Sequence, residues 1–103
     1  MLRVSEVYEK QVRNFKERPD GSEYVAFEKV FATRESLINK NYIVSVHPHE
    51  FTTDAGVSKM ESAFPEGTKF SVLVLDGNSF RKSELIVVGS FDKLCQSLEE
   101  HKK

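Results

Sequence analysis

The amino-acid sequence predicts an α+β fold: a small, mainly antiparallel sheet of about four strands with an N-terminal helix, a short inserted helix and a C-terminal helix packed on the sheet. Three patterns predict it. The run 70–75 is apolar on both faces and is followed by an Asp-Gly turn. The last third of the chain has apolar residues at helical spacing, and the first 17 residues have the same pattern. The chain of 103 residues, 39% of them hydrophobic, is long enough for a single domain spanning 1–103.

The most regular pattern lies between Lys69 and Leu98. The run 70–75 is apolar on both faces, which is typical of an interior strand. The pair Asp76-Gly77 that follows predicts a tight hairpin turn in which the glycine has a positive φ. The return strand is predicted over 79–88, with a polar interruption at 81–83 that indicates a bulge or a bend.

A C-terminal helix is predicted over 91–98. Ser90 is well placed to cap its first turn, and apolar residues recur at i, i+3, i+4 and i+7. This stripe consists of Phe91, Leu94, Cys95 and Leu98. It is expected to pack on a sheet face supplied by some of Val72, Val74, Ile86 and Val88.

Residues 4–17 are predicted to form an amphipathic helix. Their apolar side chains fall within one arc of a 3.6-residue wheel, and the charged side chains take the other side. Two acid-first pairs at i, i+4, Glu6/Lys10 and Glu9/Arg13, favour the helix, and a strand is the alternative for the first few residues only. The apolar arc comprises Val4, Val7, Tyr8, Val12 and Phe15.

The next segments are predicted in turn. Residues 18–21 form a turn, and 24–33 form a strand rather than a helix because aromatic and β-branched residues dominate there. A connection over 34–41 is expected to tuck Leu37 and Ile38 inward.

A strand over 42–47 precedes Pro48, which ends that strand or confines it to a sheet edge. A short helix is then predicted between the capping residues 52–54 and Pro65. Its apolar residues are Val57, Met60, Ala63 and Phe64.

Composition narrows the function classes. The net charge of −1 gives no global basic balance for binding nucleic acid or an anionic membrane, and no apolar run approaches the length of a membrane span. The single cysteine allows no intrachain disulfide, which suits a reducing cytoplasm, so a cytoplasmic location is expected.

Four short motifs carry a resemblance to a known family: Leu37-Ile38-Asn39, the run 42–46, the run 72–77, and Ser90 with the helix 91–98. Through them the segment 30–98 resembles small, β-rich, FlbD-like regulatory domains. The predicted leading helix and the insertion 48–68 depart from that pattern. The resemblance implies a compact sheet with a packed helix and a regulatory or interaction role, and it supplies no site residues.

His47 and His49 are the candidate metal ligands. Two imidazoles two residues apart on an extended chain can share a face, with Glu50 or Asp54 as a third ligand. Pro48 can turn the chain and spoil that geometry, and exposed strand-end histidines are the favoured interpretation. No metal, cofactor or catalytic residue is therefore predicted. Cys95 lies on the apolar helix stripe, and no nucleophile elbow or phosphate-binding loop is present.

Phe80, Arg81 and Lys82 are the candidate binding residues for nucleic acid. The aromatic ring could stack on a base while the two cations contact phosphates. The near-neutral composition favours a solvated surface instead.

The leading functional hypothesis is a non-enzymatic protein-interaction or regulatory domain that binds a protein partner or a second copy of itself. The alternatives are a nucleic-acid-binding regulator and a metal protein or enzyme built on His47 and His49. A homodimer is predicted through the first helix or the 24–32 strand, because intramolecular packing is not expected to cover all of their apolar surface.

Overall fold

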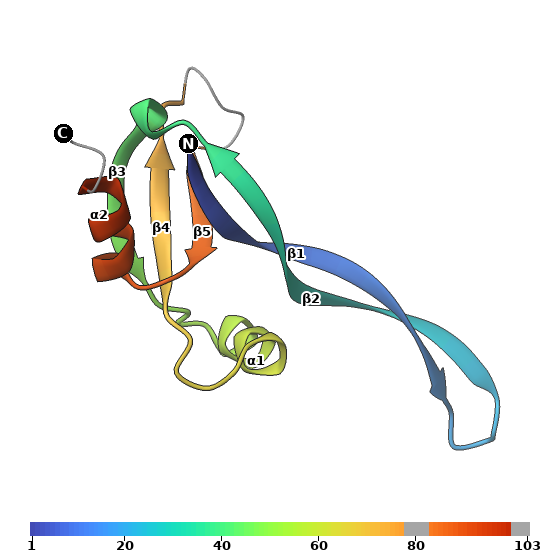
Figure 1. The fold of residues 1–103 in the computed structure, drawn as a ribbon. Helices are drawn as coiled ribbons and strands as arrows, with labels where there is room; N and C mark the ends of the chain where they lie inside the picture. The colour runs from blue at the N-terminus through green and yellow to red at the C-terminus, as the bar shows by residue number, and fades with distance from the viewer. Residues whose placement is uncertain (78–82, 100–103) are drawn as a thin grey trace.

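The computed structural model describes residues 1–77 and 83–99. It contains one five-stranded antiparallel sheet, in the order β2-β1-β5-β4-β3, and two α-helices (Figure 1). The elements in chain order are β1 (Leu2–Glu17), β2 (Glu23–Ile38), the 3-10 turn η1 (Lys40–Tyr42), β3 (Ile43–His49), α1 (Asp54–Ala63), β4 (Phe70–Leu75), β5 (Glu84–Val88) and α2 (Phe91–Glu99).

The helix predicted over 4–17 is wrong, because this segment is strand β1. It pairs with β2 residue by residue from Leu2↔Ile38 to Glu17↔Glu23. Valine and aromatic side chains favour a pleated strand, and the long pairing partner outweighs the two helical ion pairs. The additional strand also raises the sheet from the expected four strands to five.

The first hairpin is much longer than the rest of the sheet. β5 pairs with β1 in the register Glu6↔Val87, near the base of the hairpin, and the remainder of β1 and β2 projects away from the other strands as a twisted ribbon (Figure 1). The radius of gyration is 17.3 Å, whereas a compact chain of this length would have about 13 Å. The projecting ribbon accounts for this elongation.

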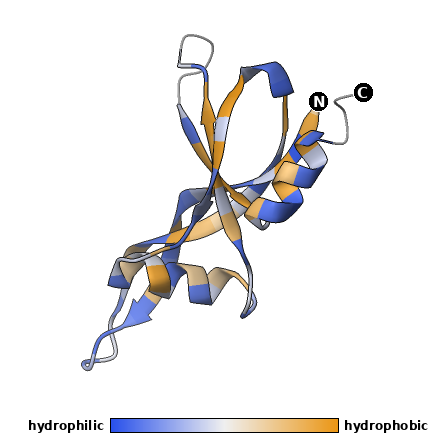
Figure 2. Ribbon diagram, turned by 90° about the vertical axis from the view of Figure 1, so that its left-hand side faces the viewer, coloured by the Kyte–Doolittle hydropathy of each residue, from blue (hydrophilic) through white to orange (hydrophobic). Residues whose placement is uncertain are grey.

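The hydrophobic core lies between α2 and one face of the sheet. It contains Leu2, Val4, Ile38, Leu73, Leu75, Val87 and Leu94. The C-terminal helix is confirmed, but it packs on the face of Leu73 and Val87 and not on the predicted face of Val72 and Ile86. Figure 2 shows hydrophobic colour along the strands that flank residues 78–82, and both colours on α2. Cys95, which the sequence places on the buried stripe of this helix, is half-buried.

Strands β4 and β5 confirm the predicted second hairpin, with β4 inside the sheet. The prediction of a positive φ at Gly77 is wrong: within residues 1–77 and 83–99, the glycines with positive φ are Gly21, Gly67 and Gly89. The expected return of the strand at 79–82 lies outside the described residues.

The other predicted segments are mostly confirmed. Residues 24–33 belong to β2, which continues through the predicted connection as far as Ile38. Ile38 is buried as expected, whereas Leu37 is 60% exposed. Pro48 lies in β3, an edge strand of the sheet.

Helix α1 covers the lower part of the other sheet face. The Thr53 hydroxyl accepts a hydrogen bond from the Gly56 N–H at 3.0 Å and caps the first turn, as the sequence predicts. Phe70 stacks edge-on against Phe51 and Phe64, with ring centroids 5.0 Å apart in both pairs. No helix in the described part of the chain is long and apolar enough to cross a membrane.

Candidate protein-interaction surface on the hairpin arm

The projecting part of the first hairpin, residues 11–29, is called the arm. Its tip is a three-residue loop in which the Arg18 N–H donates to the Ser22 carbonyl at 2.8 Å and the Gly21 N–H donates to the Arg18 carbonyl at 2.9 Å. Gly21 has a φ of 88°, which suits the left-handed residue that closes such a loop. The side chain of Asp20 accepts hydrogen bonds from the Ser22 N–H at 2.9 Å and hydroxyl at 2.6 Å. The loop therefore fixes the register of the arm.

One face of the arm carries a group of exposed apolar side chains. Phe15 pairs with Val25 across the ribbon, and Phe27 is the next residue along the same face of β2. These side chains are 71%, 42% and 61% exposed, respectively. None of the residues in the arm is buried. These three residues are called the arm patch.

The opposite face of the arm is held by polar and aromatic contacts. Lys16 lies 2.9 Å from the Glu28 carboxylate, with both side chains close to half exposed. The hydrogen bond to Glu28 and the charge of Glu28 raise the pKa of Lys16. Arg18 lies over the ring of Tyr24, 4.8 Å from its centroid. These surface contacts stabilise the shape of the ribbon and leave the arm patch open on the other side.

Among the five described strands, none pairs with the outer edge of β2 in the arm, because β2 is an edge strand of the sheet. Arg18 and Ser22 face each other across the ribbon, and hydrogen-bonding directions alternate along a strand. Even-numbered residues of β2 therefore point their backbone groups at β1, and odd-numbered residues point theirs at the free edge. The outward-pointing residues in the arm are Glu23, Val25, Phe27 and Lys29.

The charges of the arm balance. Four are basic and four are acidic, so the arm gives no basic stripe of the kind that binds phosphates. Glu17 and Glu23 stand directly opposite each other, which is unfavourable for two like charges. The charged residues are Arg13, Lys16, Arg18 and Lys29, with Glu17, Asp20, Glu23 and Glu28.

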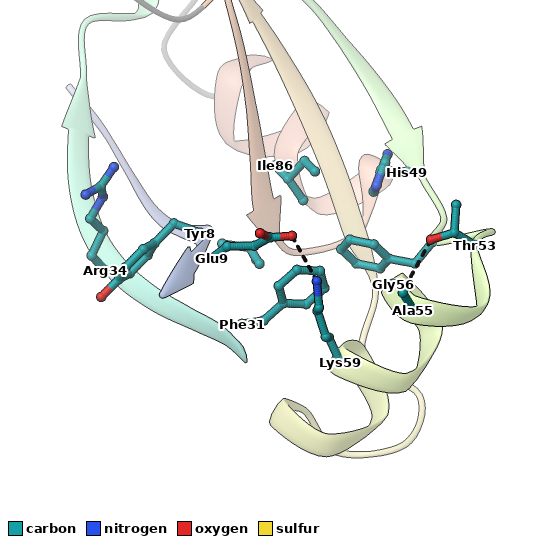
Figure 3. Close-up of a pocket in the computed structure, with 12 residues that line it drawn as sticks. Tyr8, Glu9, Phe31, Arg34, His49, Thr53, Ala55, Gly56, Lys59 and Ile86 are labelled. Atoms are coloured by element: carbon teal, nitrogen blue, oxygen red, sulfur yellow. Dashed lines mark hydrogen bonds and ion pairs between the residues drawn. The ribbon is translucent and has the colours of Figure 1, made fainter. Parts of the chain in front are cut away.

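A hollow of about 700 Å³ lies between α1 and the base of the first hairpin, next to the arm. Figure 3 shows Lys59 of α1 reaching from one side to Glu9 of β1, over the ring of Phe31. The Lys59 Nζ lies 3.2 Å from the Glu9 carboxylate, and Phe31 packs on Phe51 with ring centroids 5.0 Å apart. The ion pair and the aromatic contact join the base of the first hairpin to the body, so the charges of Lys59 and Glu9 in the hollow already compensate each other.

An ion pair also joins β1 and β2 at the base of the hairpin, where the arm meets the rest of the sheet. The carboxylate of Glu6, only 5% exposed as a residue, accepts hydrogen bonds from Arg34 at 2.9 and 3.3 Å. The bond to Glu6 and the charge of Glu6 raise the pKa of Arg34, whose guanidinium also lies 4.8 Å from the ring centroid of Tyr8. A fork-shaped guanidinium matches a carboxylate with two bonds, so this pair joins β1 to β2 at the base of the hairpin.

The candidate metal ligands His47 and His49 both lie on β3, two residues apart. The ring of His47 bonds the hydroxyl of Ser45 at 3.0 Å, and His49 packs edge-on against Phe51 with centroids 4.8 Å apart. Across the described residues, no three His, Cys, Asp or Glu side chains come together in a group that could hold a metal ion. Glu50 and Asp54 therefore do not complete a site. Phe80, Arg81 and Lys82 lie outside the described residues.

No protein family, curated protein or solved structure matches this chain. Its candidate site therefore rests on its own geometry. The sequence pointed to the 24–32 strand as an interaction surface but placed residues 4–17 in a helix, so it missed that Phe15 joins Val25 on one face. The Pro-Asp-Gly turn between two β-rich segments was the signal that could have indicated the hairpin.

Proposed function

We propose that this protein is a non-enzymatic protein-interaction domain, with a regulatory or assembly role, and that the arm is its binding element. The observation that carries the proposal is the arm patch on a ribbon that contributes no buried residue to the core. The ribbon also exposes the free edge of β2, and a free strand edge is the surface that proteins use for β-strand addition.

The energy of covering the arm patch is large enough for binding. A whole Phe side chain presents about 200 Å² of apolar surface. Because Phe15 and Phe27 are 71% and 61% exposed, together they present on the order of 250 Å² of apolar surface to water. Burial at about 25 cal/mol per Å² would contribute roughly 6 kcal/mol before the costs of association. Aromatic side chains, phenylalanine among them, are enriched in protein–protein interfaces.

The balanced charge of the arm supports a protein partner over nucleic acid. A nucleic-acid site would need several cations without matching acids, and Lys16, for example, is already held by Glu28. The resemblance to small regulatory domains agrees with an interaction role and adds no residues to it.

Site-specific photo-crosslinking tests this function. A photoreactive phenylalanine analogue is placed at Phe27 in the full chain, expressed in its native cell. The control places it at Leu37, which lies on the same strand and is 60% exposed, against 61% for Phe27. We expect a discrete protein adduct from position 27 that is absent from position 37 and is lost when Phe15→Ser is added. Equal labelling from both positions, or none from position 27, would overturn the proposal.

A further inference from the structure

We propose that the partner of the arm is a second copy of the same chain, which pairs antiparallel with it along the free edge of β2. The pairing is centred on Ala26, so that Ala26 faces Ala26 of the second copy and two ribbons become one four-stranded sheet. This inference rests on the proposed function, since it names the partner of the same surface.

The hydrogen-bonding directions allow this centre. In the pairing, Val25 faces Phe27 of the second copy and Glu23 faces Lys29 of the second copy, and each pair occurs twice by symmetry. All of these residues are odd-numbered, so their N–H and C=O groups point at the free edge and each pair can exchange two hydrogen bonds. Ala26 then occupies the narrow non-hydrogen-bonded position, which its small side chain fits.

Charge selects this register from its neighbours. A two-fold axis perpendicular to the ribbon keeps each face of the ribbon on the same side, so a residue can only face one of the same parity. Among centres from residue 24 to residue 30, centring on Glu28 or on Lys29 brings two like charges together. Within the same range, only the centre at Ala26 places opposite charges face to face, namely Glu23 and Lys29.

Within the described part of the chain, neither Glu23 nor Lys29 forms an ion pair. Across residues 1–77 and 83–99, the ion pairs are Lys16–Glu28, Arg34–Glu6 and Lys59–Glu9. Glu23 instead faces Glu17, and Lys29 faces the uncharged Gln11. In the proposed dimer, Lys29 of the second copy stands beside the two carboxylates and relieves their repulsion.

The same register joins the two apolar patches. Phe15 and Val25 of one copy lie in one row with Phe27 of the second copy, and the symmetric row lies beside it. The two arm patches thus become one continuous cluster of six side chains on one face. Cross-strand contacts between aromatic and β-branched residues are among the more stabilising pairs in a sheet.

Charge reversal tests the partner and the register together. Glu23→Lys and Lys29→Glu each place two like-charged pairs in the symmetric dimer. Mixing the two variants puts opposite charges at both contacts again. By sedimentation over a concentration series up to millimolar, we expect a dimer for the native chain, at least about ten-fold weaker association for each variant alone, and recovery in the equimolar mixture. Both residues are exposed, so the variants should fold.

A disulfide test checks the centre of the pairing. In a Cys95→Ser background, Ala26→Cys should form a covalent dimer on mild oxidation, because the facing Cα atoms would lie about 4.5 Å apart. The matched control is Asn14→Cys, which lies opposite Ala26 on β1 and would be separated from its copy by two intervening strands. Equal crosslinking at both positions would contradict the register.

The outcomes separate this inference from the proposed function. A native chain that stays monomeric at all concentrations, while Phe27 still crosslinks to a different protein, overturns self-pairing and leaves the arm as a binding element. Dimers that ignore both charge reversals overturn the register. Absence of both the dimer and the crosslink removes both proposals.

Discussion

Removal of the arm should leave the body folded. Residues 11–29 can be replaced by the two residues Asn-Gly, so that a two-residue turn links Lys10 to Val30. These two residues form a hydrogen-bonded pair in the ribbon, the kind of pair that a two-residue turn closes. The shortened hairpin keeps Glu9 and Phe31, and with them both contacts to α1.

The expected cost follows from what the arm contributes. None of its residues is buried, and its ion pair joins side chains that are 47% and 42% exposed, which contributes little to stability. An isolated two-stranded ribbon is close to zero net stability, since its hydrogen bonds barely offset the entropy of ordering it. The free energy of unfolding should therefore change by no more than about 1 kcal/mol.

Urea denaturation followed by far-ultraviolet circular dichroism measures this change under dilute, monomeric conditions. Leu73→Ala, at a residue that is 0% exposed, serves as the reference for core damage. The arm deletion should also abolish the Phe27-dependent association of the native chain. A loss of more than about 3 kcal/mol on deleting the arm, comparable to a core cavity, would refute the view that the arm lies outside the folding unit.

Four further outcomes are expected. Leu73→Ala should itself cost about 2–5 kcal/mol by urea denaturation, and a cost below the error of the fit would place the core elsewhere. Gly21→Val should fray the tip of the arm, measured by amide exchange, because valine disfavours a φ of 88°; an unchanged tip would contradict the loop. Arg34→Met should destabilise the fold more than Lys16→Met, since the Glu6 side chain is 6% exposed and the Glu28 side chain 42%; equal midpoints would argue against a structural role for Arg34. The hydrogen bonds from Ser22 lower the pKa of Asp20 below its ordinary 3.8, so its stabilisation of the tip is complete above that pH and is lost as the pH falls further; an Asp20→Asn variant should lose this pH dependence, and an identical pH profile by nuclear magnetic resonance would contradict it.

The sequence correctly predicted the segments in which the spacing of apolar residues follows from which side chains are buried. The strand 70–75 is apolar on both faces and lies inside the sheet, and Ser90 precedes a helix whose Leu94 enters the core. The sheet face predicted to receive that helix is wrong. A strand that is apolar on both sides does not indicate which of its faces the helix covers. Here the fully buried Leu73 and Val87 mark the covered face.

The first strand was misassigned for a different reason. At the base of the hairpin, Val4 and Val7 lie on opposite faces of β1 and both are buried. In the projecting ribbon neither face is buried. Neither region therefore imposes an alternation of apolar and polar residues, and the spacing of Val4, Val7, Tyr8 and Val12 matches a helix by coincidence. Strand pairing over sixteen residues is a non-local property, visible only once β2 is recognised as the partner.

The candidate site was predicted only in part. The aromatic residues of the 24–32 strand predicted an interaction surface there, and Phe27 of that strand is 61% exposed in the structure. Phe15 was assigned to a helix stripe that needed its own cover. In the structure, Val4 and Val7 of that stripe are buried within the chain, whereas Phe15 is 71% exposed. The predicted first helix is wrong, and an interface at the 24–32 strand stays a proposal.

Amide hydrogen exchange along β2 tests the central claim most directly. The N–H groups of Val25 and Phe27 point at the free edge, and those of Tyr24 and Ala26 point at β1. In the dilute, isolated chain the outward pair should exchange fast. In the complex trapped by crosslinking at Phe27, whatever its partner, the outward pair should become protected while the inward pair changes little. Outward amides already protected at dilution, or still unprotected in the complex, would contradict strand addition at the free edge of the arm.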